Sequence, residues 1–392
     1  MRLAIFVDQV FWRDGDTLST DEPYILFPAS FIESVDEIIF IGREARQAGR
    51  GPYVLDHPGI TLCSLPYYPN LYQLWRLSPS TFLEIRRRIS EQARSWDAIL
   101  IGGPNPIGQM IAMQCISLGV PVSLVVRQNL IQQMDTHRGL KRLAAMAAAN
   151  ALDWHFKRLA RNRTVFAVGG DLAREYGRFT NRVHEHMPCL MRDAQLRTFA
   201  EMCSGPNPRR LICVGRLAPE KGHHVLLEAL AHLKQRGVSC HLDIVGTGPL
   251  EAELKARSTA LGLRDNVTFR GFVPYGPALF ELYQQAGALV LPSFTEGFPQ
   301  VINESLCIGL PTIATAVGGI PLFLKDNETA MIVPPGNVTA LAAAIEQVVC
   351  RPELRERLRS NGRALMVDNT MEANRERMIG ALHAEVFSKK IA

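Results

Sequence analysis

The sequence lacks the features that mark membrane-spanning, disulfide-stabilised or metal-clustered proteins. Its 392 residues include no run of about 18 apolar residues, the length that a spanning helix needs. The eight cysteines stand singly, without a CxxC pair or the cysteine and histidine spacing of a metal site. The N-terminal residues enter a strand pattern at once, without a signal-peptide pattern. We therefore expect a cytoplasmic protein with reduced cysteines in its core.

Internal repeats and low-complexity segments are also absent, and the charge is nearly balanced. The formal net charge of +5 is too small to indicate a nucleic-acid partner. The segment 127–197 is more basic, with 13 Lys and Arg against 6 Asp and Glu. This excess has two interpretations that the sequence leaves open. It favours either an anionic partner, such as a lipid phosphate at the inner face of a membrane, or a solvated basic surface.

Short apolar segments alternate with amphipathic helical patterns through both halves of the chain, which predicts parallel sheets covered by helices on both faces. The predicted strands are 2–7, 37–41, 60–64, 97–101, 121–126, 165–168, 211–214, 241–245, 267–270, 289–291, 311–315 and 331–333. A polar segment rich in proline and glycine, 201–210, predicts a linker. The fold class is therefore α/β, with two doubly wound domains, 1–205 and 206–370, and a ligand cleft between them.

The segment 289–319 has the pattern strand, loop, helix and strand, a single βαβ unit. Open parallel sheets bind ligands in such loops. Gly297 lets the backbone approach a ligand, and the first N–H groups of the following helix suit an anion. The carboxylates of Glu296 in the loop and Glu304 in the helix can accept hydrogen bonds from sugar hydroxyls. Their spacing alone is more typical of a solvated helix face.

A second loop, GRLAPEKG at 215–222, also follows a strand and opens a helix. Arg216 and Lys221 place two positive charges beside the free N–H groups of that helix, a combination typical of a diphosphate site. Ordinary solvated loop cations are the alternative interpretation. A dinucleotide-binding domain is disfavoured, because GTGPLE at 246–251 has Glu251 where the third glycine of that fingerprint belongs.

From 211 to 337, about a third of the chain, these motifs together resemble the retaining glycosyltransferases of the GT-B fold, specifically family 4 ("glycosyl transferases group 1"). The motifs are GRLAPEKG, GTGPLE, FRGFV (269–273), LVLPSFTEGFPQVINESLCIGLPTIATAVGGIPLFL (289–324) and TAMIVPPGN (329–337). The resemblance implies two Rossmann-like domains that face a cleft. The first would bind the acceptor and the second the nucleotide sugar, and the final helix, 371–392, would pack on the first domain.

The resemblance also implies a role for each matching residue. Glu296 would face the donor sugar, while Arg216 and Lys221, next to Gly215, would neutralise the diphosphate; we expect these three side chains to be catalytic. Glu304 would hold the ribose hydroxyls. The backbone of Phe272 and Val273 would meet the base. The loop and helix residues that would surround the sugar and phosphate are Gly297, Phe298, Pro299, Gln300 and Val301. The implied reaction retains configuration and needs no protein nucleophile, metal ion or other cofactor.

The first half departs from the family pattern at three places. The glycine-rich loop that many members have after the first strand is replaced by Asp8-Gln9-Val10-Phe11. Gly102 or Gly103 stands where many members carry a histidine near the reacting sugar. Arg127 stands where another histidine is common, and it is either a phosphate or sugar ligand or a surface arginine. These departures leave the acceptor contacts and the level of activity open.

The sequence therefore predicts a glycosyltransferase that moves a sugar from a nucleoside-diphosphate sugar to a glycan or lipid-linked acceptor. We expect it to act in polysaccharide or lipid-linked glycan biosynthesis, in the cytoplasm or at the inner face of the membrane. A UDP-sugar is favoured as the donor, and a GDP-sugar remains open. The alternatives are a catalytically silent glycosyltransferase-like binding subunit and a GT-B-like nucleotide-sugar epimerase.

Overall fold

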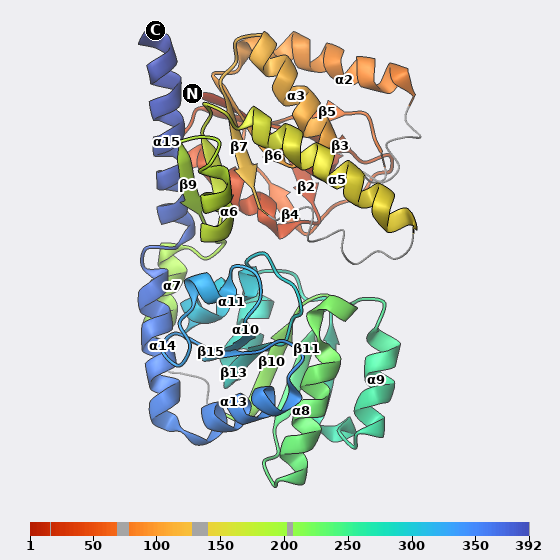
Figure 1. The fold of residues 1–392 in the computed structure, drawn as a ribbon, viewed down its shortest axis with the longest axis vertical. Coiled ribbons are helices and arrows are strands. Elements are labelled where there is room, and N and C mark those ends of the chain that lie inside the picture. The colour runs from red at the N-terminus through yellow and green to blue at the C-terminus, as the bar shows by residue number, and fades with distance from the viewer. Residues whose placement is uncertain (16, 69–77, 128–139, 202–206, 392) are drawn as a thin grey trace. The chain divides into compact units, whose positions relative to one another are not determined.

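A computed structural model describes residues 1–15, 17–68, 78–127, 140–201 and 207–391. The chain forms two compact units, which we call unit 1 (Met1–Pro188 with Ala373–Ala392) and unit 2 (Cys189–Glu372) (Figure 1). Residues 202–206 of the predicted linker and 128–139 of the basic segment lie outside the described residues.

Unit 1 contains a nine-stranded sheet in which seven parallel strands have the order β5-β3-β1-β6-β7-β8-β9. The far end of β1 pairs with β2, and β2 with β4, in antiparallel fashion. The strands are β1 (Arg2–Asp14), β2 (Thr17–Thr20), β3 (Glu37–Glu44), β4 (Tyr53–Leu55), β5 (Ile60–Leu65), β6 (Ala98–Gly103), β7 (Val122–Val126), β8 (Val165–Val168) and β9 (Val183–His186).

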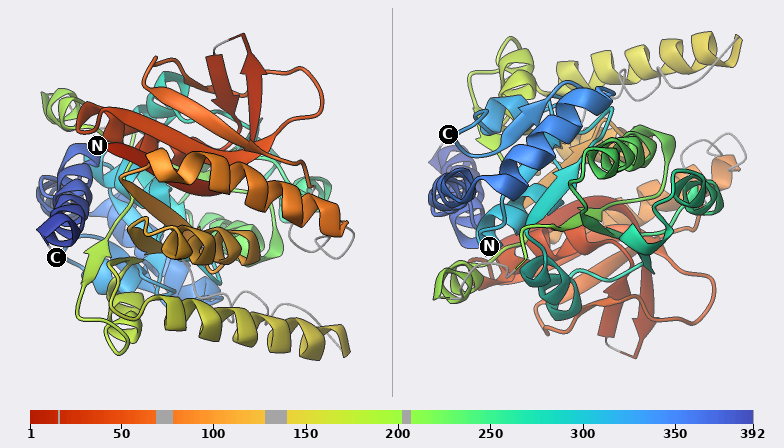
Figure 2. Two further views of the ribbon diagram at one scale, coloured as in Figure 1. Left: turned by 90° about the horizontal axis from the view of Figure 1, so that it is seen from above. Right: turned by 90° about the horizontal axis from the view of Figure 1, so that it is seen from below.

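Helices cover the parallel sheet of unit 1. One face packs against Ile85 of α2, Ile111 of α3 and Phe156 of α5, and Figure 2 shows α5 as the long yellow helix on the outside of this layer. The α-helices are α1 (Leu26–Ala29), α2 (Pro79–Gln92), α3 (Pro106–Ser117), α5 (Leu140–Leu159), α6 (Gly170–Tyr176) and α15 (Met371–Ile391). The short 3-10 helices are η1 (Pro23–Ile25), η2 (Ser30–Glu33) and η4 (Ala93–Ser95).

Unit 2 contains a six-stranded, wholly parallel sheet with the order β12-β11-β10-β13-β14-β15. Its strands are β10 (Arg210–Val214), β11 (His241–Val245), β12 (Val267–Gly271), β13 (Ala288–Leu291), β14 (Thr312–Thr315) and β15 (Met331–Val333). Its helices are α7 (Asp193–Glu201), α8 (His223–Gln235), α9 (Glu251–Ala260), α10 (Pro277–Gln285), α11 (Gln300–Ile308), α12 (Ile320–Phe323), α13 (Val338–Cys350) and α14 (Pro352–Met366), with 3-10 turns η5 (Pro219–Lys221) and η6 (Arg264–Asn266).

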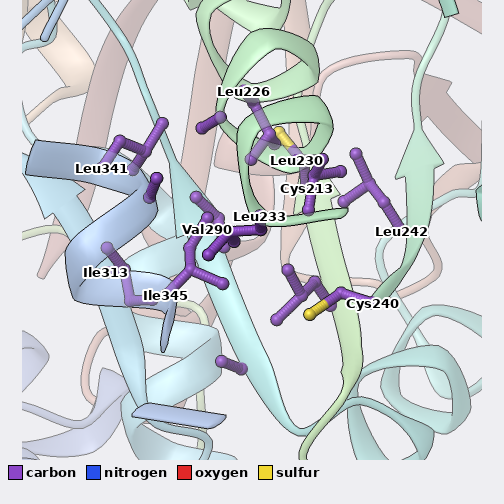
Figure 3. Close-up of a cluster of buried hydrophobic side chains, with 14 of the residues drawn as sticks. Cys213, Leu226, Leu230, Leu233, Cys240, Leu242, Val290, Ile313, Leu341 and Ile345 are labelled. Atoms are coloured by element: carbon purple, nitrogen blue, oxygen red, sulfur yellow. The ribbon is translucent and has the colours of Figure 1, made fainter. Parts of the chain in front are cut away.

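Alternation along each strand of unit 2 divides its core into two layers, because successive side chains point to opposite faces of a sheet. Cys213 and its neighbours on that face pack against α8 and α13 (Figure 3). Ile212 points the other way and packs against α10 and α11. Both faces are covered, as a parallel sheet requires. The prediction of an α/β fold with parallel sheets is thus confirmed.

Several local features differ from the sequence prediction. The first strand is 13 residues long rather than six, because its far end pairs with β2. Strand β9 and helix α7 were not predicted, since their patterns are polar. The units divide at 188/189 rather than at 205/206, because Cys189, Met191 and Phe199 pack into the core of unit 2. The segment Ala373–Ala392 groups with unit 1.

Within the described part of the chain, none of the helices combines the length and the apolar character that a membrane crossing demands.

Truncation of a core leucine in α8 should destabilise unit 2. Leu233 is fully buried against Leu242 and Ile345, so we expect Leu233→Ala to lower the free energy of unfolding by about 2–5 kcal/mol. Leu322→Ala, at a leucine that is 47% exposed, should change it by less than about 0.5 kcal/mol. Urea unfolding followed by circular dichroism measures both variants. Equal midpoints for the two variants would contradict the packing described here.

Tryptophan fluorescence gives an internal reference for this experiment. All four tryptophans, Trp12, Trp75, Trp96 and Trp154, belong to the segment Met1–Pro188 of unit 1. If the units unfold independently, Leu233→Ala should shift the transition seen by circular dichroism and leave the fluorescence midpoint in place.

Candidate functional site

The candidate site lies at the carboxyl edge of the unit 2 sheet, where the strand order reverses. Strands β10, β11 and β12 follow one another in one direction, and β13, β14 and β15 continue on the other side of β10. Ligands of open α/β sheets bind at such a switch point, outside the carboxyl ends of the strands. The loop after β10 and the loop after β13 both end there, and they contain most of the residues that the sequence singled out.

An ion pair joins these two loops. Lys221 Nζ, after β10, lies 2.6 Å from Glu296 Oε1, after β13. The hydroxyl of Ser293 donates to the same carboxylate oxygen at 2.7 Å. The Glu296 side chain is only 8% exposed, so the pair is shielded from water on most sides. The hydroxyl of Thr315 in turn donates to the Ser293 carbonyl at 2.6 Å, which fixes the start of the loop.

Two glycines allow the loops to approach this closely. Gly222 has φ +66°, and a Cβ on it would lie 2.1 Å from the carbonyl oxygen of Pro292. Gly318, after β14, has φ +56°, and its Cβ would lie 1.9 Å from the carbonyl oxygen of Glu296. A side chain at either position would therefore push the loop after β13 away, and the left-handed backbone favours glycine in any case.

Glu304 lies in a drier environment on helix α11. The residue is 4% exposed, and its carboxyl group accepts a hydrogen bond of 2.7 Å from the hydroxyl of Tyr283 on α10. Burial raises the pKa of Glu304 to about 7, while the Tyr283 hydrogen bond acts in the opposite direction. The two glutamates of the predicted pair thus have different surroundings. Glu296 faces a lysine and a hydroxyl at the loop, and Glu304 lies among apolar and phenolic groups.

The remaining predicted cation is on the same edge. Arg216 is 68% exposed and pairs with Glu220 within the loop after β10. Gly215, directly before it, donates its N–H to the carbonyl of Val245 at 2.9 Å, which ties this loop to the end of β11. Arg216 is therefore an exposed cation at the surface, whereas Lys221 is held by its carboxylate partner.

The other residues predicted in unit 2 flank the loop after β13 or follow β12. Phe298 packs edge-on against Phe323, with ring centroids 4.9 Å apart, so its backbone and not its ring borders the loop. Helix α11 begins at Gln300, after Pro299, and Val301 packs toward the core. Phe272 is 60% exposed after β12, and Val273 is packed against the same core layer.

Arg127 does not belong to this group, because it lies in unit 1 directly after β7. Its guanidinium stacks on the ring of Tyr24 at 3.6 Å from the centroid. Both residues line a cavity of about 530 Å³, together with Gly102 and Gly103. This cavity lies beside the middle of β1 and the carboxyl end of β6, where the strand order of the unit 1 sheet reverses.

The wall of this cavity includes a polar network that the sequence did not reveal. Asp8 lies where the pairing of β1 with β3 is irregular, and its Oδ1 is 3.2 Å from Arg43 Nε. The Tyr68 hydroxyl donates to Asp8 Oδ1 at 2.8 Å, and the Asn105 amide donates to Oδ2 at 3.1 Å. The only sequence signal was a polar residue immediately after the first strand. Ser293 of unit 2 is likewise a polar residue shortly after a predicted strand. Nothing in the sequence around Tyr283 indicated that it belongs to the site.

The family comparison covers most of unit 2. Residues 200–365 match the model of the family described as glycosyl transferases group 1. The alpha-D-kanosaminyltransferase of Streptomyces kanamyceticus is 37% identical over 157 residues, which are 40% of each chain. The chain spans about half or less of the length of the curated relatives that it matches.

Solved structures resemble the whole chain. Anabaena HepE in complex with UDP-glucose superimposes with a TM-score of 0.68 at 16% identity, over 98% of this chain and all of that one. WaaG, a glycosyltransferase involved in lipopolysaccharide biosynthesis, superimposes with a TM-score of 0.70 at 16% identity, over 96% and 98% of the two chains. At these identities the likeness shows the fold, which is GT-B.

The buried carboxyl group of Glu304 should make stability depend on pH. Its folded pKa of about 7 lies above the ordinary value of 4.5, so between these pH values the folded protein binds more protons than the unfolded chain. Its contribution to stability is full below about pH 4.5 and falls as the pH rises to about 7. The loss should be about 2–3 kcal/mol.

Glu304→Gln keeps an acceptor for the Tyr283 hydroxyl and removes the titration. The difference in unfolding free energy between the wild type and this variant should therefore decline across the same pH range. Glu253→Gln, at an exposed glutamate of α9, serves as the control and should give a flat difference. If the unfolding free energies of the wild type and of Glu304→Gln follow parallel curves against pH, Glu304 does not titrate in this range.

Proposed function

Residues 200–365 belong to the family of glycosyl transferases group 1, and from this premise we propose that the protein transfers a sugar from a nucleoside-diphosphate sugar to a hydroxyl acceptor with retention of configuration. The observation that supports the proposal most is the Lys221–Glu296 pair at the switch point of unit 2. A cation that would bind a phosphate and a carboxylate that would bind a sugar hydroxyl lie side by side at the opening of two helices.

In this reaction the bond between the sugar carbon and the diphosphate breaks, and negative charge develops on the leaving diphosphate. Lys221 and Arg216 would neutralise that charge, together with the free N–H groups at the start of α11. Lys221 is already held in place, so little reorganisation would be needed at that position. With two cations from the chain, the proposed reaction requires no metal ion and no other cofactor.

Glu296 and Glu304 would bind different hydroxyls of the donor. Glu296, at the loop, would orient the sugar, and Glu304, deeper on α11, would accept from the ribose. The backbone of Phe272 and Val273 would border the base. We favour a UDP-sugar, because the structural neighbour HepE binds UDP-glucose; a GDP-sugar is the second candidate.

Unit 1 would bind the acceptor in the cavity beside Asp8 and Arg127. We propose a glycan or a lipid-linked glycan as the acceptor, in polysaccharide or glycolipid assembly, since the neighbour WaaG acts in lipopolysaccharide biosynthesis. The basic segment 127–197 is consistent with association at the inner face of a membrane.

Calorimetric titration with UDP and GDP, each with and without Mg²⁺, tests the donor site. We expect micromolar binding of UDP that the metal does not strengthen, because the chain supplies the positive charge. Tighter binding of GDP than of UDP would indicate a GDP-sugar as the donor. Failure of both nucleotides to bind would contradict the proposal and favour a catalytically silent subunit.

Removal of either member of the ion pair should reduce turnover strongly. Lys221→Ala and Glu296→Gln should each lower the release of UDP from UDP-glucose by about 10²–10³-fold, the range for loss of one preorganised electrostatic group. Circular dichroism should show that both variants fold. Lys325→Ala removes an exposed lysine of unit 2 outside the site and is the matched control. Wild-type turnover in both site variants would reject the site.

A further inference from the structure

We infer that Ser293 is a positioning residue for the proposed reaction. Its hydroxyl would hold the Glu296 carboxylate toward the donor sugar after the diphosphate has drawn Lys221 away. The inference rests on the proposed function, because it concerns the same donor site, and it gives a role to a side chain that would not itself touch the donor.

The two oxygens of the Glu296 carboxylate have different surroundings. Oε1 accepts from Lys221 Nζ at 2.6 Å and from the Ser293 hydroxyl at 2.7 Å. Oε2 accepts no hydrogen bond from the residues that the structure describes, and it is not one of their buried unpartnered atoms. The carboxylate is therefore anchored through Oε1 and presents Oε2, the oxygen that a sugar hydroxyl would meet.

The two donors to Oε1 differ in how a diphosphate would affect them. Lys221 comes from the loop after β10, and its side chain is 23% exposed. A diphosphate has more negative charge than one carboxylate, so it would attract the ammonium group away from Glu296. Ser293 is fully buried, and its neutral hydroxyl has a single proton, which it donates to Glu296. Ser293 is thus the donor that would remain on Oε1 in the complex.

The edge of the sheet holds Ser293 in place. The hydroxyl of Thr315, at the end of β14, donates to the Ser293 carbonyl at 2.6 Å, and Thr315 is itself buried. The next residue, Phe294, donates its N–H to the carbonyl of Glu220 at 2.8 Å. None of these bonds involves Lys221 or the Glu296 carboxylate. Ser293 can therefore keep its position whether or not the ion pair is intact.

Removal of the Ser293 hydroxyl should impair turnover more than nucleotide binding. In Ser293→Ala, Glu296 would lose its fixed donor, so the carboxylate would be poorly oriented toward the sugar. We expect kcat for the release of UDP from UDP-glucose to fall about 10–100-fold, the factor for one hydrogen bond to a charged group. The Kd for UDP, which carries no sugar, should change by less than about twofold. Ser258→Ala, at a buried serine of α9, is the matched control and should alter neither quantity.

A double-mutant cycle shows whether Ser293 acts through Glu296. Glu296→Ala removes the acceptor of the Ser293 hydroxyl. In that background Ser293→Ala should lower turnover by less than about threefold, because residues that act as a unit are not additive. An equal loss of turnover in the two backgrounds would overturn the inference. Wild-type kcat in Ser293→Ala would also overturn it, as would a loss of UDP affinity in that variant as large as its loss of kcat.

The wild type separates this role from the proposed function. If the wild type binds UDP and releases it from UDP-glucose, and Ser293→Ala does so at the same rate, the role of Ser293 is wrong and the transferase activity stands. If GDP is the nucleotide that binds, GDP and GDP-mannose replace UDP and UDP-glucose in the same cycle. If the wild type binds neither nucleotide, or turns over neither sugar donor, the proposed function itself fails.

Discussion

The arrangement of the candidate site in unit 2 depends on the ion pair between Lys221 and Glu296. A buried or nearly buried pair gains little net stability, because the loss of hydration offsets most of the attraction between the charges. Its effect here is geometric. It joins the loop after β10 to the loop after β13 across the point where the strand order reverses. Gly222 and Gly318 permit this closeness, and Ser293 and Thr315 fix one end of the loop.

The same pair accounts for the different chemistry of the two glutamates. Glu296 lies beside a cation and a hydroxyl at the loop. Among the described residues, the Tyr283 hydroxyl donates to Glu304, and burial raises the pKa of Glu304 to about 7. In the proposed reaction, a diphosphate would compete with Glu296 for Lys221. The carboxylate would then be available to a sugar hydroxyl, so that donor binding and donor orientation would be linked through one side chain.

Much of the fold could be predicted from the sequence because parallel strands buried on both faces are short, continuous apolar segments. The strand 288–291 and the helix that begins at Gln300 illustrate this, since each has a local pattern and a defined end. Strands β2 and β4 could not be predicted, because they are short and are stabilised by pairing with the far end of β1. Strand β9 and helix α7 have mixed patterns and depend on tertiary contacts. The unit boundary was displaced for the same reason, since Cys189 and Met191 pack with residues more than 80 positions away.

The two candidate ligand sites differ in how far the sequence could reveal them. The contacts of the unit 2 site lie within motifs, so Lys221 and Glu296 could be named in advance, although the contact between them could not. The network of unit 1 joins Asp8, Arg43, Tyr68 and Asn105, which come from four separate segments and share no motif. A donor site that recognises a common diphosphate can be built from recurring local patterns. An acceptor site has to match one particular ligand, and if the unit 1 cavity binds the acceptor as we propose, its specificity would arise from long-range contacts that only the folded structure brings together.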